Sequence, residues 1–160
     1  MNNRQPNSLH CFVCGVANPF GLHLKFYEPA PGEVTAQVTL SDEFQGYPGV
    51  AHGGVVAAML DEAAGRAQMG PVDNPRFMFT AKIEINYRRN VPVGKPIRLV
   101  GKALESRGRK SIASAAIYDQ EDNLLAEAHA LMIKVPDQVL NSVDVEALGW
   151  KVYPEETSEL

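Results

Sequence analysis

The sequence predicts an α+β fold in which one long helix packs against a mostly antiparallel sheet of about six strands. Two observations lead to this prediction. Residues 53–69 have the composition of a single helix, and strand-like segments come as two before it and four in direct succession after it. The chain has 160 residues, of which 45% are hydrophobic, and this is enough for one domain with one core.

The two strands before the helix form a predicted hairpin. Residues 22–27 and 33–40 carry β-branched and aromatic side chains in rough alternation, and the segment Pro29-Ala30-Pro31-Gly32 between them has the composition of a turn. A loop rich in glycine and proline, residues 44–49, then leads to the helix.

The helix is expected to run from Gly53 to Met69, because Gly70-Pro71 is a typical stop signal. From Gly53 to Leu60 it carries no charge, and its apolar residues fall on all sides. This pattern indicates a helix that is buried around most of its circumference.

Four strands are expected after the helix, at about residues 77–90, 95–106, 109–119 and 124–134. The tail that follows is acidic, and we expect a short helix near residues 141–148 and an otherwise poorly ordered end. The predicted organisation is an N-terminal segment (residues 1–21), a central domain (22–136) and a C-terminal tail (137–160).

Charge is unevenly distributed along a chain whose net charge is -4. Residues 82–110 contain nine basic side chains and only two acidic ones, Glu84 and Glu105. Such a stretch indicates either an anionic ligand or merely solvated strand faces. The basic residues are Lys82, Arg88, Arg89, Lys95, Arg98, Lys102, Arg107, Arg109 and Lys110.

Two adjacent carboxylates interrupt the apolar helix. Glu62 has a structural explanation, because Arg66 lies four residues on, the spacing at which an acid and a base meet on a helix surface. Asp61 has only Ala64 and Gly65 at the corresponding positions, so no local partner offsets its desolvation. Asp61 is therefore a candidate functional carboxylate, although an exposed helix side or a base elsewhere in the fold would also accommodate it.

The start of the helix is a second candidate site. Gly53 and Gly54 lower the intrinsic helicity, which suggests that a ligand approaches the backbone closely, although a tight turn would explain them equally well. The first N–H groups of a helix have no internal partner and can hold an anion or a polarised carbonyl oxygen. His52 is expected to hold this loop by hydrogen bonds, since no Gly-x-Ser-x-Gly nucleophile turn is present.

Cys11 and Cys14 form a Cys-x-x-Cys pair near the N-terminus. Buried, reduced thiols that steady this segment are the favoured interpretation. A zinc site that also uses His10 and His23 is the alternative, although such sites usually show a second Cys or His pair at regular spacing. A redox pair is a third possibility, but no thioredoxin-like pattern surrounds it.

Several classes of protein are disfavoured. No stretch approaches the roughly 20 apolar residues of a membrane span, and the N-terminus lacks the apolar run of a signal peptide. Two cysteines are too few for a disulfide-stapled secreted domain. We therefore expect a cytoplasmic protein that has no membrane partner.

Four further motifs occur in a characteristic order: residues 45–54 followed by Asp61-Glu62, the strand motif at 80–89, the turn at 106–110 and the last strand at 126–134. Together they resemble the hotdog-fold acyl-CoA thioesterases of the PaaI-like group. The opening Cys11-Phe12-Val13-Cys14-Gly15 also occurs in many such bacterial chains.

This resemblance implies a hotdog fold, with protomers joined edge to edge in a homodimer or homotetramer and active sites shared across the dimer. It places the thioester carbonyl at the N–H of Gly53 or Gly54, the catalytic carboxylate of Asp61 on the other protomer, and a water-orienting hydroxyl at Thr80. The chemistry needs a donor for the developing oxyanion and a carboxylate that acts as base or nucleophile.

The same resemblance places Asn86, Arg88, Arg109 and Lys110 where relatives contact coenzyme A, whose phosphates suit Arg and Lys. We therefore expect a thioesterase that hydrolyses an acyl- or aryl-acyl-CoA without a cofactor. The alternatives are a hotdog hydratase or dehydratase and a non-catalytic acyl-CoA-binding module. Nucleic acid is disfavoured as the anion, because the chain is acidic overall and no binding motif for it is present.

Overall fold

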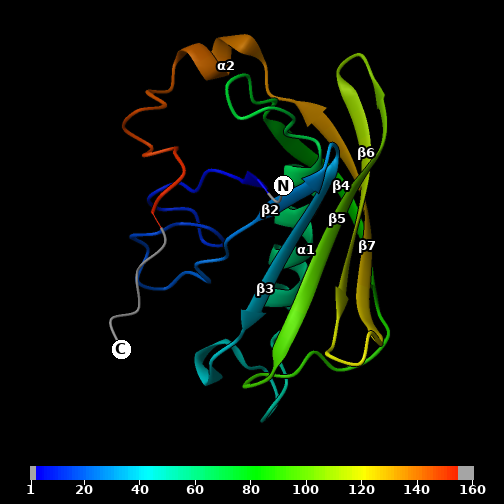
Figure 1. Ribbon diagram of the computed structural model, residues 1–160. Coiled ribbons are helices and arrows are strands. Elements are labelled where there is room, and N and C mark those ends of the chain that lie inside the picture. Colours follow the sequence, from blue (N-terminus) through cyan, green and yellow to red (C-terminus); the bar gives the residue numbers. More distant parts are fainter. Residues whose placement is uncertain (1–2, 155–160) are drawn as a thin grey trace.

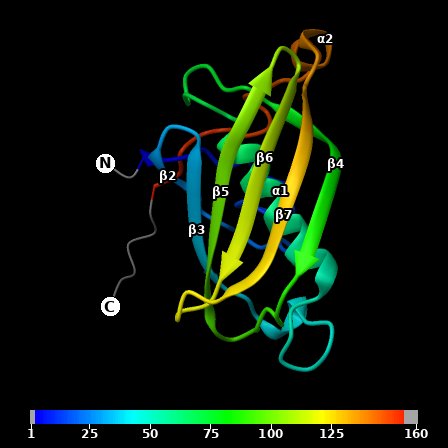
Figure 2. The same ribbon diagram turned by 90° about the vertical axis from the view of Figure 1, so that its right-hand side faces the viewer.

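A seven-stranded antiparallel sheet wraps around one long helix, α1 (Gly53–Ala67). The computed structural model describes residues 3–154, and α1 lies along one face of the sheet (Figure 1, Figure 2). The α+β prediction is confirmed, with seven strands rather than about six because a two-residue strand joins one edge. The strands, in the order in which they pair, are β1 (Asn3–Arg4), β2 (Tyr27–Ala30), β3 (Glu33–Thr39), β5 (Pro96–Arg107), β6 (Lys110–Tyr118), β7 (Leu124–Lys134) and β4 (Met78–Tyr87).

The predicted hairpin is present, but its first strand is shorter than expected. β2 begins at Tyr27, and the strand predicted from residue 22 is wrong over residues 22–26. The reason is that the N–H groups of Leu22 and Leu24 each donate a 2.8 Å hydrogen bond to a carbonyl of the N-terminal segment. The turn itself is confirmed, and Gly32 takes the left-handed conformation in it with φ +76°.

The helix and the four strands after it lie close to their predicted bounds. α1 ends at Ala67, two residues before Met69, and Gly70 follows with φ +69°. A short 3-10 helix, η1 (Asp42–Phe44), precedes the loop that leads to α1.

The short helix of the tail is displaced from its predicted position. α2 (Asp137–Asn141) begins directly after Pro136, whereas a helix was expected near residues 141–148. In that stretch Asp144 Oδ1 instead accepts hydrogen bonds from the N–H groups of Glu146 and Ala147. Such local side-chain bonds compete with helix formation, which explains the difference.

The rest of the tail packs on the N-terminal segment. Asn7 and Lys151 exchange backbone hydrogen bonds of 2.9 and 3.1 Å, and the Trp150 ring meets the Phe77 ring edge to face with 5.4 Å between centroids. The expectation of a poorly ordered end is therefore wrong as far as Pro154. The last residues of the predicted tail, 155–160, lie outside the described part of the chain.

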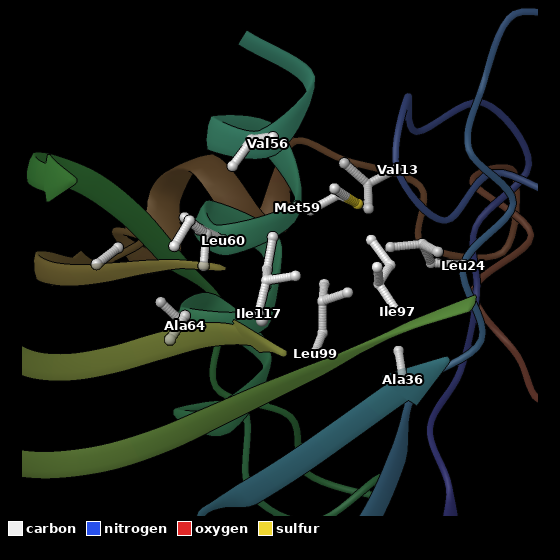
Figure 3. Packing of buried hydrophobic residues seen from close by; sticks show 14 of the residues in the cluster. Val13, Leu24, Ala36, Val56, Met59, Leu60, Ala64, Ile97, Leu99 and Ile117 are labelled. Carbon is white, nitrogen blue, oxygen red and sulfur yellow. The ribbon is translucent and has the colours of Figure 1, made fainter. Parts of the chain in front are cut away.

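The core lies between α1 and the sheet (Figure 3). Met59 of α1 and Leu99 and Ile117 of the sheet are completely buried in one cluster. The two layers approach so closely that a Cβ on Gly101 of β5 would lie 2.2 Å from the carbonyl oxygen of Ala63. The absence of a side chain at Gly101 therefore allows α1 to pack this closely against the sheet.

Within the described residues 3–154, strand β4 forms one edge of the sheet and pairs with β7 alone. Along its ten residues most side chains are exposed, including Phe79 and Tyr87 at 54% each. A long exposed edge strand is a template for pairing with another chain.

Candidate active site

Asp61 and Thr80, both singled out from the sequence, contact each other directly. Asp61 lies on α1 and is half-buried, and its Oδ1 accepts a 2.6 Å hydrogen bond from the Thr80 hydroxyl on β4. The lack of a local helical partner for Asp61 is thus resolved by a residue of the neighbouring strand. One carboxylate oxygen is oriented by Thr80, and the other is left for a further contact.

The two carboxylates of α1 line one cavity of about 220 Å³ together with both cysteines of the chain. Thr80 and Trp150 lie in the same wall, so β4 and the tail both contribute to it. The remaining lining residues are Ser8, Gly65, Arg66, Met69, Arg76, Phe77, Met78 and Met132.

Glu62 and Arg66 form the predicted ion pair, with 2.8 Å between Arg66 Nε and Glu62 Oε1. The predicted surface setting is wrong, because the Arg66 side chain is only 2% exposed. Its Nη1 donates to the Pro6 carbonyl at 2.9 Å, and its guanidinium lies 4.6 Å from the Phe26 ring centroid. The N-terminal segment covers this side of the helix, a long-range arrangement that helical spacing cannot reveal.

At the start of α1, His52 caps the helix. Its Nδ1 accepts a 2.9 Å hydrogen bond from the N–H of Gly54, the structural role favoured for it from the sequence. The Gly54 amide is therefore already used, whereas within residues 3–154 the N–H of Gly53 has no acceptor. Of the two glycines, Gly53 is the better donor for an incoming carbonyl. The Tyr87 hydroxyl, which the sequence analysis did not single out, donates to the Gly53 carbonyl at 2.8 Å.

The two halves of the predicted site are separated along one helix. Gly53 and Asp61 are eight residues apart on α1, a rise of about 12 Å. Within one chain they cannot contact the same reacting carbonyl. Each half is tied to a different end of β4, since Gly53 bonds to Tyr87 and Asp61 bonds to Thr80.

The predicted coenzyme A contacts are also divided. Asn86 pairs with Glu127 of β7, whereas Lys110 pairs with Ile133, so the two pairs lie about 20 Å apart along β7. Arg88 is near the first pair, and Arg109, exposed in the β5–β6 turn, is near the second. A single chain therefore does not bring the four residues together.

The basic stretch at residues 82–110 is partly neutralised by neighbours. Arg88 pairs with Glu127 at 2.6 Å, and four other basic residues have an acidic partner within 4.0 Å. Among residues 3–154, Arg109 and Lys110 make no ion pair and are exposed at the turn. The four other paired residues are Lys82, Arg98, Lys102 and Arg107.

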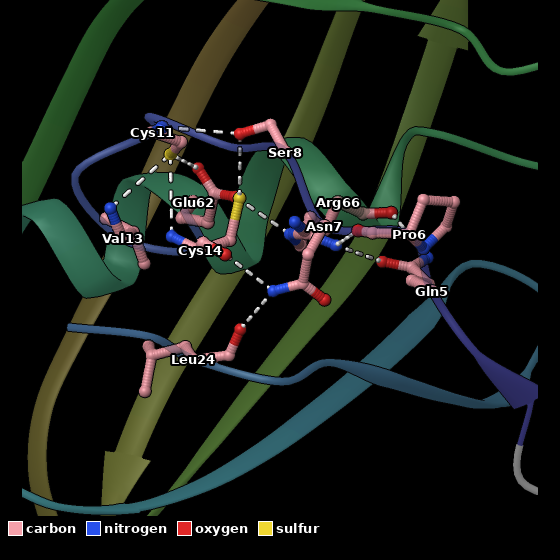
Figure 4. Close-up of polar contacts among 10 residues, drawn as sticks. All are labelled: Gln5, Pro6, Asn7, Ser8, Cys11, Val13, Cys14, Leu24, Glu62 and Arg66. Atoms are coloured by element: carbon pink, nitrogen blue, oxygen red, sulfur yellow. Dashed lines mark hydrogen bonds and ion pairs between the residues drawn. The ribbon is translucent and has the colours of Figure 1, made fainter. Parts of the chain in front are cut away.

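The cysteines lie against α1, where Cys11 is next to Glu62 (Figure 4). The Cys14 thiol donates to Cys11 and lowers the pKa of Cys11 to about 6, although burial and the charge of Glu62 act in the opposite direction. The same contact raises the pKa of Cys14. His10 and His23 are exposed and do not join the cluster of possible metal ligands, which Glu62 joins instead.

A larger cavity of about 860 Å³ lies between the N-terminal segment, β3 and the start of α1. Its walls include Phe12, Leu22, Phe44 and Val55, and His52 lies among them. The helix start therefore adjoins a cavity whose walls carry both apolar and polar side chains. The sequence analysis missed it because its walls come from segments that are distant in the chain.

Comparisons with known proteins identify relatives of this chain. Residues 48–126 match the family described as the thioesterase superfamily. The acyl-coenzyme A thioesterase THEM4 of Xenopus laevis is 31% identical over 111 residues, which cover 69% of this chain and 49% of that protein. THEM4 of Rattus norvegicus is 28% identical over 117 residues, which cover 72% and 49%. The chain thus spans about half the length of the curated relatives it matches.

Solved structures share the fold. A crystal structure of a thioesterase superfamily protein has a TM-score of 0.71 and 29% identity, covering 78% of this chain and 60% of that one. The PaaI protein of E. coli, from a phenylacetic acid degradation operon, has a TM-score of 0.65 and 13% identity, covering 72% and 81%. A Streptococcus mutans protein bound to acetyl CoA has a TM-score of 0.63 and 19% identity, covering 70% and 88%. None of the helices within residues 3–154 is long and apolar enough to span a membrane.

Proposed function

The chain belongs to the thioesterase superfamily and has the hotdog fold, and we propose that it hydrolyses an acyl- or aryl-acyl-CoA to the free acid and coenzyme A. The observation that carries this proposal is the hydrogen bond from Thr80 to Asp61 in a cavity beside the edge strand. It presents a half-buried carboxylate with a fixed orientation, as a thioester hydrolase requires.

The Asp61 carboxylate either activates the attacking water or attacks the thioester itself. With Thr80 bonded to Oδ1, the other oxygen can accept a proton from water as that water attacks the thioester carbon. Alternatively the same oxygen attacks the carbon itself, and water then hydrolyses the resulting anhydride. In both routes the carbon–sulfur bond breaks and the coenzyme A thiolate leaves.

The N–H of Gly53 holds the thioester oxygen as it gains negative charge. It lies at the N-terminus of α1, where the helix dipole favours an anion. One positioned donor of this kind is worth roughly 10² to 10³ in rate. The cavity beside His52 offers space for an acyl group near this donor, along the side chains of Phe12, Phe44 and Val55.

The complete site forms between two copies of the chain. If the exposed β4 edges pair antiparallel about a two-fold axis, the Tyr87 end of one strand lies beside the Thr80 end of the other. Because Gly53 is tied to Tyr87 and Asp61 to Thr80, this pairing brings the oxyanion donor of one copy toward the carboxylate of the other.

The same pairing unites the proposed coenzyme A contacts. Asn86 and Arg88 lie at the Tyr87 end of β4, whereas Arg109 lies at its Met78 end. Met78 pairs with Lys134 of β7, and the N–H of Lys134 donates a hydrogen bond to the Arg109 carbonyl. Across two antiparallel β4 strands these ends become neighbours. Phosphates would then contact Arg109 and Lys110 of one copy and Asn86 and Arg88 of the other.

Release of thiol from a panel of acyl-CoAs, followed with a colorimetric reagent, tests the proposal. We expect release with at least one acyl class, and binding without release would support the acyl-CoA-binding module instead. A hydratase needs a second acid or base beside the first. It is disfavoured because Glu62, the other carboxylate of this cavity, is committed to Arg66.

A further inference from the structure

Cys11, Cys14 and Glu62 converge on one point beside α1 (Figure 4). One potential ligand atom from each residue lies within 4.8 Å of the others, and Cys11 Sγ is 3.9 Å from Glu62 Oε2. The thioester chemistry proposed above uses none of the three.

The turn that carries the two cysteines is already shaped for a metal ion. The backbone N–H groups of Val13 and Cys14 point at Cys11 Sγ, at 3.4 and 3.5 Å. N–H groups in this arrangement stabilise a thiolate ligand without occupying the position of the metal. A Cβ on Gly15 would lie 2.4 Å from the carbonyl oxygen of Cys11, so the tight turn depends on glycine there.

Buried contacts hold this turn against the body of the protein. Asn7 is 1% exposed, and its Nδ2 donates to the carbonyls of Cys14 and Leu24 at 2.6 and 2.8 Å. The cysteine turn is thereby fixed relative to the chain that follows it. Little rearrangement is needed before the three side chains could share an ion.

Arg66 orients the carboxylate of the group. Its Nε is bonded to Glu62 Oε1, which leaves Oε2 turned toward Cys11. The charges also balance: two thiolates, one carboxylate and a divalent cation sum to -1, which the buried guanidinium of Arg66 offsets. A partly buried cluster that is neutral overall avoids the cost of an uncompensated charge.

We propose that Cys11, Cys14 and Glu62 bind one thiophilic divalent cation, for which Zn²⁺ is the best match, with a fourth position open to the cavity that contains Asp61. Tetrahedral zinc with typical bond lengths places its ligand atoms roughly 3.5 to 3.8 Å apart. Cys11 Sγ and Glu62 Oε2 already lie 3.9 Å apart, and all three ligand atoms lie within 4.8 Å of one another. The ion would clamp the N-terminal segment to α1. Glu62 takes the place that sequence reasoning gave to His10 and His23.

Metal titration tests the site directly. The full chain, stripped with a chelator and reduced, is titrated with Co²⁺ and then Zn²⁺. We expect one equivalent of Co²⁺ to produce thiolate-to-cobalt charge-transfer absorption, which Zn²⁺ then abolishes. Zn²⁺ should also raise the melting temperature of the stripped protein. These readouts do not depend on thioesterase activity.

Variants identify the ligands. Cys11→Ser and Cys14→Ser should each remove the charge-transfer band and the zinc-induced stabilisation, and Glu62→Gln should weaken binding by at least about tenfold. The matched control is the double variant His10→Ala with His23→Ala, which alters two exposed residues and should bind as the parent does. The proposal is overturned if the stripped parent takes up no metal, or if the histidine variant loses metal while the cysteine variants retain it.

Discussion

The Thr80 hydroxyl donates a 2.6 Å hydrogen bond to Asp61 Oδ1, which joins the edge strand β4 to the central helix at the proposed catalytic carboxylate. The two residues are 19 positions apart in the sequence, so the contact exists only because β4 folds back along α1. It links the orientation of Asp61 to the strand on which we propose that a second copy of the chain docks.

Thr80→Val keeps the shape of the side chain but removes the donor to Asp61. A hydrogen bond to a charged group is worth about 1.5 to 3 kcal/mol, so we expect kcat to fall roughly 10- to 100-fold. Thr80→Ser keeps the hydroxyl and should retain most of the rate. Because Thr80 is exposed, both variants should melt as the parent does. Equal rates for the Val and Ser variants would remove Thr80 from the mechanism.

Glu62 and Arg66 should affect stability unequally. Glu62→Ala leaves the 2% exposed guanidinium of Arg66 without its counter-ion, so we expect a loss of about 3 kcal/mol in the free energy of unfolding. Arg66→Met should cost less, because Glu62 is 23% exposed and can turn to water.

Chemical denaturation of the metal-free protein checks this order. Glu33→Ala, which breaks the exposed pair with Lys102, is the matched control and should cost no more than about 1 kcal/mol. A loss for Glu62→Ala as small as that of the control would mean that the pair behaves as a surface contact after all.

Arg109→Ala with Lys110→Ala tests the phosphate contacts. Both side chains are exposed, so their loss should raise KM for acyl-CoA roughly tenfold and leave kcat nearly unchanged, more clearly at low salt. An acyl N-acetylcysteamine has no phosphates, so the double variant should hydrolyse it as fast as the parent does. Lys95→Ala removes another exposed base and serves as control. Equal losses on both substrates would assign these two residues a structural role.

The shared site can be tested by mixing two defective chains. At acyl-CoA concentrations well below KM, Asp61→Asn and the double variant Asn86→Ala with Arg88→Ala should each be poorly active as homodimers. A purified heterodimer of the two has one composite site with every group intact, so it should regain roughly half of the parental rate. A heterodimer as inactive as both parents, or an active monomer in sedimentation, would place the whole site in one chain.

Local sequence patterns were sufficient to predict most helices and strands, but not the long-range contacts between them. The helix from Gly53 and the four strands after it were predictable, because apolar periodicity and glycine or proline stops act within a few residues. The strand expected from Leu22 failed for a non-local reason, since the N-terminal segment takes its hydrogen bonds.

The candidate site shows the same division. The spacing of Glu62 and Arg66 predicted their pairing, but not the burial that the N-terminal segment and Trp150 impose on it. Asp61 and Thr80 were identified separately, and only the fold shows that they bond. Glu62 and Cys11 are 51 residues apart, so no sequence pattern could pair them.

The central claim is that the Asp61 carboxylate acts as the base or the nucleophile in thioester hydrolysis. Asp61→Asn tests it most directly, because asparagine keeps the volume of the side chain and removes the carboxylate. Thiol release from the best acyl-CoA of the panel should fall at least about 100-fold, with the melting temperature and the sedimentation of the parent preserved. Asp73→Asn, in an exposed loop, should leave the rate unchanged. A rate near that of the parent for a folded Asp61→Asn protein would contradict the mechanism.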